Sequence, residues 1–268
     1  MDEWAEGTEI ARGATAVVSR GAPGTVVKTL LPGFPTIILS LEATAMQAAH
    51  AAGLPVPALL EARLEADPPC LVMSYAEGTE LADLVPALGP VAVGEILADV
   101  QHQVRGVSGP DAMVTVHDYV GSSIGRAPIG EQWREAAVAE LRALPDGQTL
   151  CHFDRHPRNI LWDGQPTIID WNNGVQGHPA ADVSRTRIVV GGSIHYVPDE
   201  HRAAVTPALG LLLKAFERRT EELAPGLIAQ SRAWDAVVSV MRLDDSPPQG
   251  HRSEIRAFLA ARWGESPN

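Results

Sequence analysis

A chain of 268 residues is long enough for one large domain or for two lobes with substantial cores. Its formal net charge of −12 disfavours a nucleic-acid partner, because proteins that bind nucleic acids carry basic patches. Two cysteines do not make a disulfide framework, and no apolar run is long enough to cross a bilayer. The acidic N-terminus lacks the basic and apolar regions of a signal peptide. We therefore expect a cytoplasmic monomer or homodimer with no membrane and no nucleic-acid partner.

The first quarter of the chain predicts a small antiparallel sheet. β-Branched and apolar residues recur between clusters of glycine and proline, which are typical of turns. One strand follows Gly7, and four more are predicted over 14–18, 25–30, 55–61 and 70–75.

One lysine in this region occupies an unusual position. Lys28 shares its strand face with apolar residues, and the burial of an unpaired charge is costly. The alternative is an edge strand whose lysine reaches solvent. A helix is predicted over 40–52, begun by Ser40, and Glu42 lies in its first turn. Considered alone, Glu42 is an ordinary charge at the start of a helix. It is a candidate functional residue only because it could pair with Lys28.

The remainder of the chain is predominantly helical in pattern. Residues 106–130 are rich in glycine, serine and proline and are predicted to form a loop, interpreted as a lid over the substrate. Apolar residues at helical spacing predict helices over 90–104, 133–144, 179–190, 200–223, 228–242 and 251–263.

The stretch between residues 151 and 171 carries the residues with clearest chemical meaning. Asp154 and Asn159 share one short loop, and an apolar run then leads to Asp170. Two carboxylates and an amide in this arrangement can hold a hydroxyl nucleophile and one or two Mg²⁺ ions. With Lys28 and Glu42 upstream, the five residues follow the order found in kinases.

The chain resembles the aminoglycoside phosphotransferase family, within the protein-kinase-like fold. The family pattern H-G-D-x-H-P-x-N is matched over 152–159, and I-D-[WF] is matched over 169–171. The pattern G-D-P-x-x-D is matched over 177–182, and the resemblance covers about residues 7–190. Two positions depart from it, since Phe153 replaces a glycine and His178 replaces an aspartate.

This resemblance implies an α+β, bilobal protein-kinase-like fold. An N-terminal nucleotide-binding lobe over 1–76 would contain an antiparallel five-stranded sheet plus one helix. A larger, mainly helical C-terminal lobe over 79–268 would hold the catalytic and acceptor-binding residues. The hinge between them would lie at about 73–78.

The resemblance also implies residue roles. Asp154 would accept or orient the acceptor hydroxyl, while Asn159 and Asp170 would bind Mg²⁺. Lys28, held by Glu42, would bind the α- and β-phosphates of ATP, with GTP as an alternative donor. Further candidates are Gly13, Met73, Ser74 and Ala76 for the nucleotide, and His152 and Asp182 as structural support. Arg155 and Arg158 are interpreted as solvated loop charges, with a phosphate-binding role as the alternative for Arg155.

The acceptor is expected to be a small molecule with a hydroxyl group. The family resemblance and the acidic balance favour an aminoglycoside-like or other cationic antibiotic, and hence a role in antibiotic resistance. A metabolite such as an amino alcohol or a sugar is the alternative. Candidate carboxylates for cationic groups are Glu221, Glu222, Asp244 and Asp245, although an acidic residue on a helix is more often a charge on a solvated face.

Three other functions compete with this interpretation. A metal-dependent hydrolase could use His152, Asp154 and His156 as metal ligands, with His178 as a further one, but Lys28, Glu42 and Asn159 would then have no role. A binding module without turnover has no sequence feature in its favour. A protein kinase is disfavoured by the H-P pair at 156–157 and by the absence of an A-P-E segment.

Overall fold

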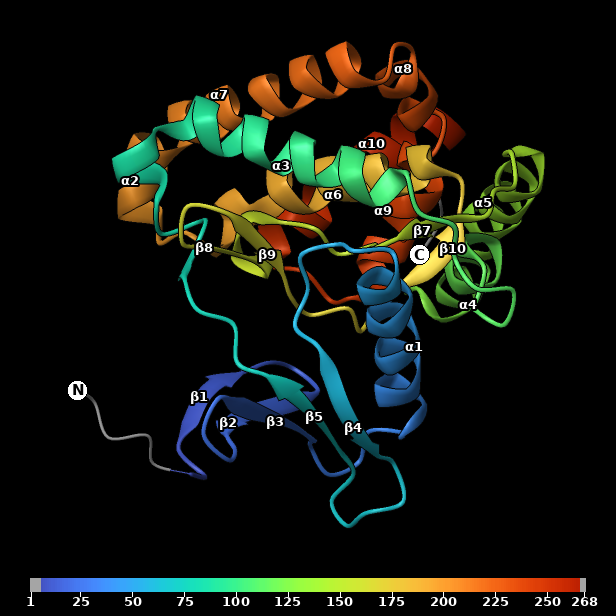
Figure 1. Cartoon of the computed structure of the whole chain (residues 1–268). Coiled ribbons are helices and arrows are strands. Elements are labelled where there is room, and N and C mark those ends of the chain that lie inside the picture. The colour runs from blue at the N-terminus through green and yellow to red at the C-terminus, as the bar shows by residue number, and fades with distance from the viewer. Residues whose placement is uncertain (1–5, 266–268) are drawn as a thin grey trace.

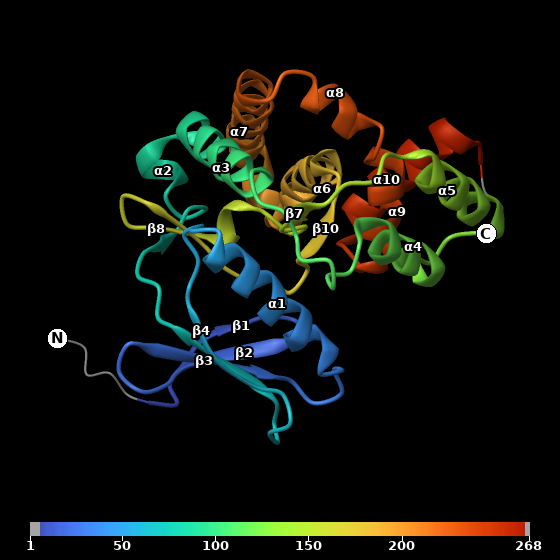
Figure 2. The ribbon, with the colours of Figure 1, turned by 45° about the vertical axis from the view of Figure 1, so that its right-hand side comes forward.

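The computed structural model describes residues 6–265. Five strands form one antiparallel sheet in the order β1-β2-β3-β5-β4, and one long helix, α1, packs against β4 and β5. α1 also reaches β7 in the second half of the chain, so it stands between the sheet and the helices (Figures 1 and 2). These elements are β1 (Glu9–Arg12), β2 (Ala16–Arg20), β3 (Thr25–Leu30), α1 (Ile37–Ala51), β4 (Leu59–Arg63) and β5 (Cys70–Ser74).

Two boundaries in this part differ from the predicted ones. The helix begins at Ile37 and not at Ser40, because Leu39 is buried in the core and Ile38 packs against it, which adds a turn before Ser40. Glu42 therefore lies in the second turn and is buried. The strand predicted from residue 55 begins at Leu59, since the prolines before it have no N–H group to donate to a sheet.

The rest of the chain is mainly helical, with two small sheets at its centre. α3 and α7 pack against each other, and α6 runs beneath them (Figure 2). The helices are α2 (Val85–Leu88), α3 (Pro90–Arg105), α4 (Val116–Arg126), α5 (Glu131–Ala143), α6 (Pro179–Gly192), α7 (Asp199–Leu223), α8 (Leu227–Arg232), α9 (Asp235–Asp244) and α10 (Gln249–Trp263).

One loop prediction and one helix prediction in this part were wrong. Residues 106–130 are not one loop, since α4 lies within them and buries Val116, Val120 and Ile124 at a spacing of four. Its glycines and serines concealed this short apolar stripe. The helix predicted over 228–242 is divided into α8 and α9 by Ala233 and the buried Trp234.

The small sheets position the central loop. β7 (Thr149–Cys151) pairs with β10 (Val175–Gly177), while β8 (Ile160–Trp162) pairs with β6 (Thr79–Glu80) and with β9 (Pro166–Ile168). Asp154 and Asn159 therefore lie between β7 and β8, and Asp170 follows β9.

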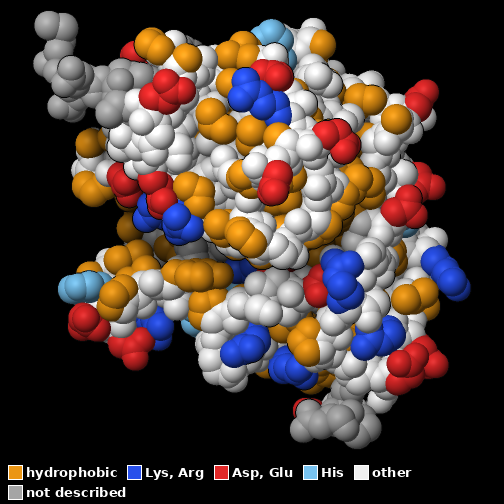
Figure 3. Space-filling model, turned by 90° about the horizontal axis from the view of Figure 1, so that it is seen from below, with side chains coloured by type: hydrophobic (Ala, Val, Ile, Leu, Met, Phe, Trp, Pro, Cys, Tyr) orange, Lys and Arg blue, Asp and Glu red, His pale blue; other side chains and the backbone are white. Residues whose placement is uncertain are grey.

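The predicted fold class is confirmed: an antiparallel five-stranded sheet with one helix precedes a larger helical part. The exact lobe boundary between 76 and 79, with the hinge at 73–78, stays a prediction. From residue 6 to residue 265, no helix combines the length and apolar character needed to cross a membrane. Seen from the side of the sheet, basic, acidic and apolar side chains are interspersed on the surface (Figure 3).

Candidate active site

Lys28 joins the sheet, α1 and the segment after β9. Its Nζ lies 2.7 Å from Glu42 Oε1 and 2.7 Å from Asp170 Oδ1. The side chains of Lys28 and Glu42 are 9% and 1% exposed, whereas that of Asp170 is 39% exposed. One end of this charged trio is therefore sealed in the core, and the other end is accessible to a ligand.

Charge compensation decides the ionisation of the trio. Burial lowers the pKa of Lys28, but the carboxylates of Glu42 and Asp170 raise it by more, so the ammonium form persists. Burial raises the pKa of Asp170, but the charge and hydrogen bond of Lys28 lower it by more. The pKa of Glu42 is raised by burial and by Asp170, because one lysine is shared between two carboxylates. Lys28 and Asp170 thus form a charged pair.

The loop after β7 brings Asp154 and Asn159 together. Asn159 Nδ2 donates a 2.9 Å hydrogen bond to the backbone oxygen of Asp154. The Asp154 carboxylate is 23% exposed, and its nearest basic partner is Arg185, whose Nη2 lies 3.4 Å from Asp154 Oδ1. The carboxylate is thus accessible while its backbone is fixed.

Asp182, on α6, binds the start of the same loop. Its Oδ1 accepts a 2.9 Å hydrogen bond from the Phe153 N–H group, and its Oδ2 accepts one of 3.3 Å from the N–H group of His152. Gln101 and Arg155 also donate to Asp182 Oδ2, at 3.0 and 3.2 Å. Arg155 is fully buried, so its interpretation as a solvated charge was wrong, whereas Arg158 is 63% exposed as expected.

Phe153, which departs from the family pattern, has an uncommon backbone conformation. Its φ of 62° lies in the left-handed region, where a glycine would carry no steric penalty. The fully buried ring packs edge-on against Tyr119, and Arg185 Nε donates to its carbonyl oxygen at 3.1 Å. Asp182, Arg185 and this packing hold a conformation that costs about 1–3 kcal/mol.

His178, the second departure, begins α6. Its Nδ1 accepts a 3.2 Å hydrogen bond from the N–H group of Ala180, so the imidazole caps the helix as an aspartate would. Burial lowers the pKa of His178, which favours the neutral ring that can accept this bond.

His152 connects the loop to the segment of Asp170. Its Nε2 donates to the Ile169 carbonyl oxygen at 3.0 Å, and its Nδ1 accepts from the Asp154 N–H group at 3.3 Å. Burial, together with the charge of Arg155, lowers the pKa of His152 to about 4. Each ring nitrogen of the neutral imidazole therefore already makes a hydrogen bond.

The hydrolase alternative finds no support in this geometry. His152 has no nitrogen left for a metal, and His178 is a helix cap. Across residues 6–265, no group of three His, Cys, Asp or Glu side chains could hold a metal ion.

The predicted nucleotide contacts lie on the sheet. Met73, on β5, is buried beside Val26 of β3. The Ser74 N–H group donates to the Ala58 carbonyl oxygen at 2.9 Å, so this N–H group is not free for an adenine edge. The Gly13 N–H group donates to Ala16 O at 2.9 Å and closes the bend between β1 and β2, so it is not free for a phosphate. Ala76 follows β5, on the chain that leaves the sheet.

The carboxylates proposed for a cationic acceptor divide into two pairs. Glu221 accepts hydrogen bonds from the N–H groups after α7, and Glu222 pairs with Arg218 and Arg219 of the same helix. Those two carboxylates thus form contacts that stabilise the C-terminal end of α7 and the turn after it. Asp244 pairs with Arg126 of α4, and Asp245 pairs with Arg185, which places both at the side of the loop where Tyr119 packs on Phe153.

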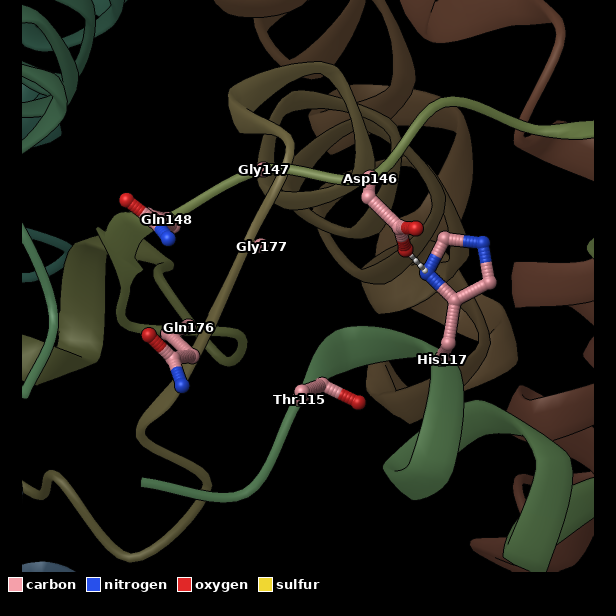
Figure 4. Close-up of a pocket in the computed structure, with 7 residues that line it drawn as sticks. All are labelled: Thr115, His117, Asp146, Gly147, Gln148, Gln176 and Gly177. Atoms are coloured by element: carbon pink, nitrogen blue, oxygen red, sulfur yellow. Dashed lines mark ion pairs between the residues drawn. The ribbon is translucent and has the colours of Figure 1, made fainter. Parts of the chain in front are cut away.

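A separate pocket of about 430 Å³ lies at the other end of β7 and β10 from the loop (Figure 4). In it, His117 Nδ1 points at Asp146 Oδ1, 3.0 Å away. It is lined by Thr115, His117, Asp146, Gly147, Gln148, Gln176 and Gly177. None of these is a phosphoryl-transfer candidate, so the pocket is distinct from the site around Asp154.

Sequence reasoning missed Arg185 and the residues around it. Arg185 follows Asp182 by three residues, a spacing that places both side chains on one face of α6. This spacing is the sequence signal that could have indicated Arg185 as a residue of the site. Tyr119 had no such signal, because α4 was predicted as loop.

Comparisons with known proteins agree on the family and the fold. The model of a phosphotransferase enzyme family, APH, matches residues 7–210. The structure of an aminoglycoside-3'-phosphotransferase of type VIII is similar, with 20% identity and a TM-score of 0.62, covering 91% of this chain and 92% of that one.

Two further solved structures are similar. An amicoumacin kinase, in complex with AMP-PNP, Ca²⁺ and Ami, has 17% identity and a TM-score of 0.61, covering 94% of this chain and 86% of its own. A choline kinase from Streptococcus pneumoniae has 13% identity and a TM-score of 0.60, covering 96% of this chain and 94% of that one.

No curated protein sequence matches the chain. The structural neighbours, all at low identity, establish the fold, and the family model spans most of the chain. The chain therefore belongs to the APH phosphotransferase enzyme family.

Proposed function

We propose that this enzyme transfers the γ-phosphoryl group of ATP to a hydroxyl group of a small molecule. The observation that carries the proposal is the bridge from Lys28 to Glu42 and Asp170, next to the loop of Asp154 and Asn159. A buried, charged lysine whose second carboxylate partner is accessible is the arrangement that phosphate binding requires.

The donor atoms beside this bridge fit Mg²⁺. Asp170 offers an accessible carboxylate, and the hydrogen bond from Asn159 Nδ2 to Asp154 directs the amide oxygen away from that contact. Hard oxygen ligands of this kind suit Mg²⁺, which, when bound with nucleotide, neutralises charge on the phosphates. Asn159 and Asp170 are therefore the proposed metal ligands.

Asp154 is the proposed base. Its accessible carboxylate takes the proton of the acceptor hydroxyl as the new oxygen–phosphorus bond forms and the bond to the ADP oxygen breaks. Lys28 would hold the α- and β-phosphates. Because the transition state is largely metaphosphate-like, the chain contributes mainly position and charge.

Two classes of acceptor are candidates. A cationic, aminoglycoside-like antibiotic is supported by the net charge of −12 and by the family. A sugar, the uncharged member of the alternative class, is supported by the pairing of Asp245 with the two largely buried arginines Arg185 and Arg242, because a carboxylate paired in this way offers little to an ammonium group.

Asp154→Asn tests the proposal. We expect phosphoryl transfer to fall by about 100-fold or more, while Mg·ATP binding is retained. Asp170→Ala should instead weaken the binding of ATP in the presence of Mg²⁺. The measurements are a screen of hydroxyl compounds with mass detection of the phosphorylated product, and calorimetric titration with Mg·ATP. Near-wild-type turnover by Asp154→Asn would show that Asp154 is not the base.

A further inference from the structure

Arg185 is a buried arginine that contacts the proposed base from behind. Its side chain is 3% exposed, its Nε donates to the carbonyl oxygen of Phe153, and its Nη2 lies 3.4 Å from Asp154 Oδ1. A guanidinium held this way orients the carboxylate, but full pairing would also neutralise it. A base neutralised by an arginine accepts a proton poorly.

Asp245 competes with Asp154 for this arginine. Arg185 Nη2 lies 2.7 Å from Asp245 Oδ2, which is shorter than its 3.4 Å distance to Asp154. Arg242 Nη1 approaches the same Asp245 oxygen at 3.2 Å, and its Nη2 donates to the Tyr196 hydroxyl at 2.8 Å. Asp245 is therefore placed between two largely buried arginines.

We propose that Asp245 and Arg185 are positioning residues for Asp154: Arg185 orients the base, and Asp245 draws the arginine's charge away from it. The proposal rests on the proposed function of Asp154. Burial lowers the pKa of Arg185, but Asp245 and then Asp154 raise it by more, which agrees with a permanently charged guanidinium shared between the two carboxylates.

This arrangement has a consequence for the acceptor. Arg185 and Arg242 both contact Oδ2 of Asp245, so an ammonium group would meet a carboxylate whose charge two arginines already compensate. Asp245 thus serves the base and does not receive a cation. The acceptor of this enzyme needs no ammonium group at this position.

The test is Asp245→Asn, which removes the charge and keeps the shape. Hydrolysis of ATP with water as the acceptor can be measured before the natural acceptor is identified. We expect kcat to fall by roughly 10-fold, with KM for Mg·ATP unchanged, because Asp154 becomes the remaining carboxylate partner of Arg185. Asp245→Glu should restore most of the lost rate.

Asp235→Asn is the matched control. Asp235 also joins α9 to α6, through a 2.8 Å pair with Arg187, but it has no contact with the loop of Asp154. Both variants should lose similar thermal stability, and only Asp245→Asn should lose rate. Equal rates in the two variants would overturn the proposal, as would a rise in KM for an aminoglycoside with kcat unchanged.

A double variant tests whether Asp245 acts through Arg185 or independently of it. Arg185→Gln should lower kcat moderately, and Asp245→Asn combined with Arg185→Gln should match Arg185→Gln alone, because no guanidinium remains to be restrained. Additive losses would contradict the proposal. If the wild-type protein neither hydrolyses ATP nor phosphorylates any compound, the proposed kinase function is wrong. If it does either, the rates of these variants test the positioning role of Asp245 and Arg185 separately.

Discussion

The two sides of Asp154 are built from charges in opposite ways. On the sheet side, one lysine serves two carboxylates, and the accessible one, Asp170, is left for a ligand. On the helical side, Asp245 is shared by Arg185 and Arg242, and little of its charge is left over. We propose that the first arrangement binds metal and phosphate, and that the second positions Asp154 as the base.

The largest effect is expected on the sheet side, from Lys28→Met. It leaves the carboxylate of Glu42 buried without a partner, which should lower the free energy of unfolding by about 3–5 kcal/mol. It should also lower kcat/KM for ATP by about 100- to 1000-fold. Urea unfolding and steady-state kinetics measure the two losses.

The double variant Lys28→Met, Glu42→Gln separates these losses. Removal of both charges should recover most of the stability but none of the activity. Recovery of activity as well would mean that Lys28 acts only as a counter-charge for Glu42, and the contrast between the two sides would be lost.

The two sides also differ in how well the sequence predicts them. Lys28, Glu42, Asp154, Asn159 and Asp170 stand in short local patterns whose order along the chain suggests a kinase, and the structure brings Lys28 to Glu42 and Asp170. The prediction of the sheet succeeded for a similar reason, since its strands are separated by clear turn residues.

The helical side could not be predicted in this way. Arg185, Arg242 and Tyr119 come from α6, α9 and α4, and only tertiary packing brings them to the loop of Asp154 or to Asp245 beside it. α4 itself was hidden by its glycines and serines. Buried arginines carry no periodic pattern, because their burial depends on partners that are distant in sequence.

The next effect concerns His152, which links the loop of Asp154 to the segment of Asp170. Its pKa of about 4 lies below the ordinary value of 6.5, so between these values the unfolded chain binds a proton that the folded chain does not. Stability is therefore complete above about pH 6.5 and falls as the pH falls towards 4, by roughly 3 kcal/mol. Urea unfolding between pH 7 and pH 4.5 measures the slope.

His152→Gln should flatten this pH dependence, because glutamine can still donate to the Ile169 carbonyl oxygen and does not titrate. His201→Gln, at an exposed position on α7, is the control and should leave the slope as in the wild type. An unchanged slope in His152→Gln would assign the acid sensitivity to other groups, among them His251, whose pKa burial also lowers to about 4.

The smallest effect is expected at His178, which caps the helix that carries Asp182 and Arg185. His178→Ala removes the acceptor for the Ala180 N–H group and should lower the free energy of unfolding by about 1 kcal/mol. His178→Asp keeps an acceptor and should retain the stability at pH 7.

The pH dependence distinguishes the cap from simple packing. Because the pKa of His178 is lowered by burial, its contribution is present at neutral pH and is lost as the pH falls and the imidazole takes up a proton. His178→Asp should therefore exceed the wild type in stability at pH 5, where an aspartate still accepts. Thr115→Ala, which removes the cap of α4, is the matched control, since the Thr115 hydroxyl accepts from the Asp118 N–H group and does not titrate. If the wild type and His178→Asp lost stability in parallel between pH 7 and pH 5, the imidazole would not be acting as the cap. The histidine would then only fill the space of the aspartate in the family pattern, on the side of the molecule that we propose positions Asp154.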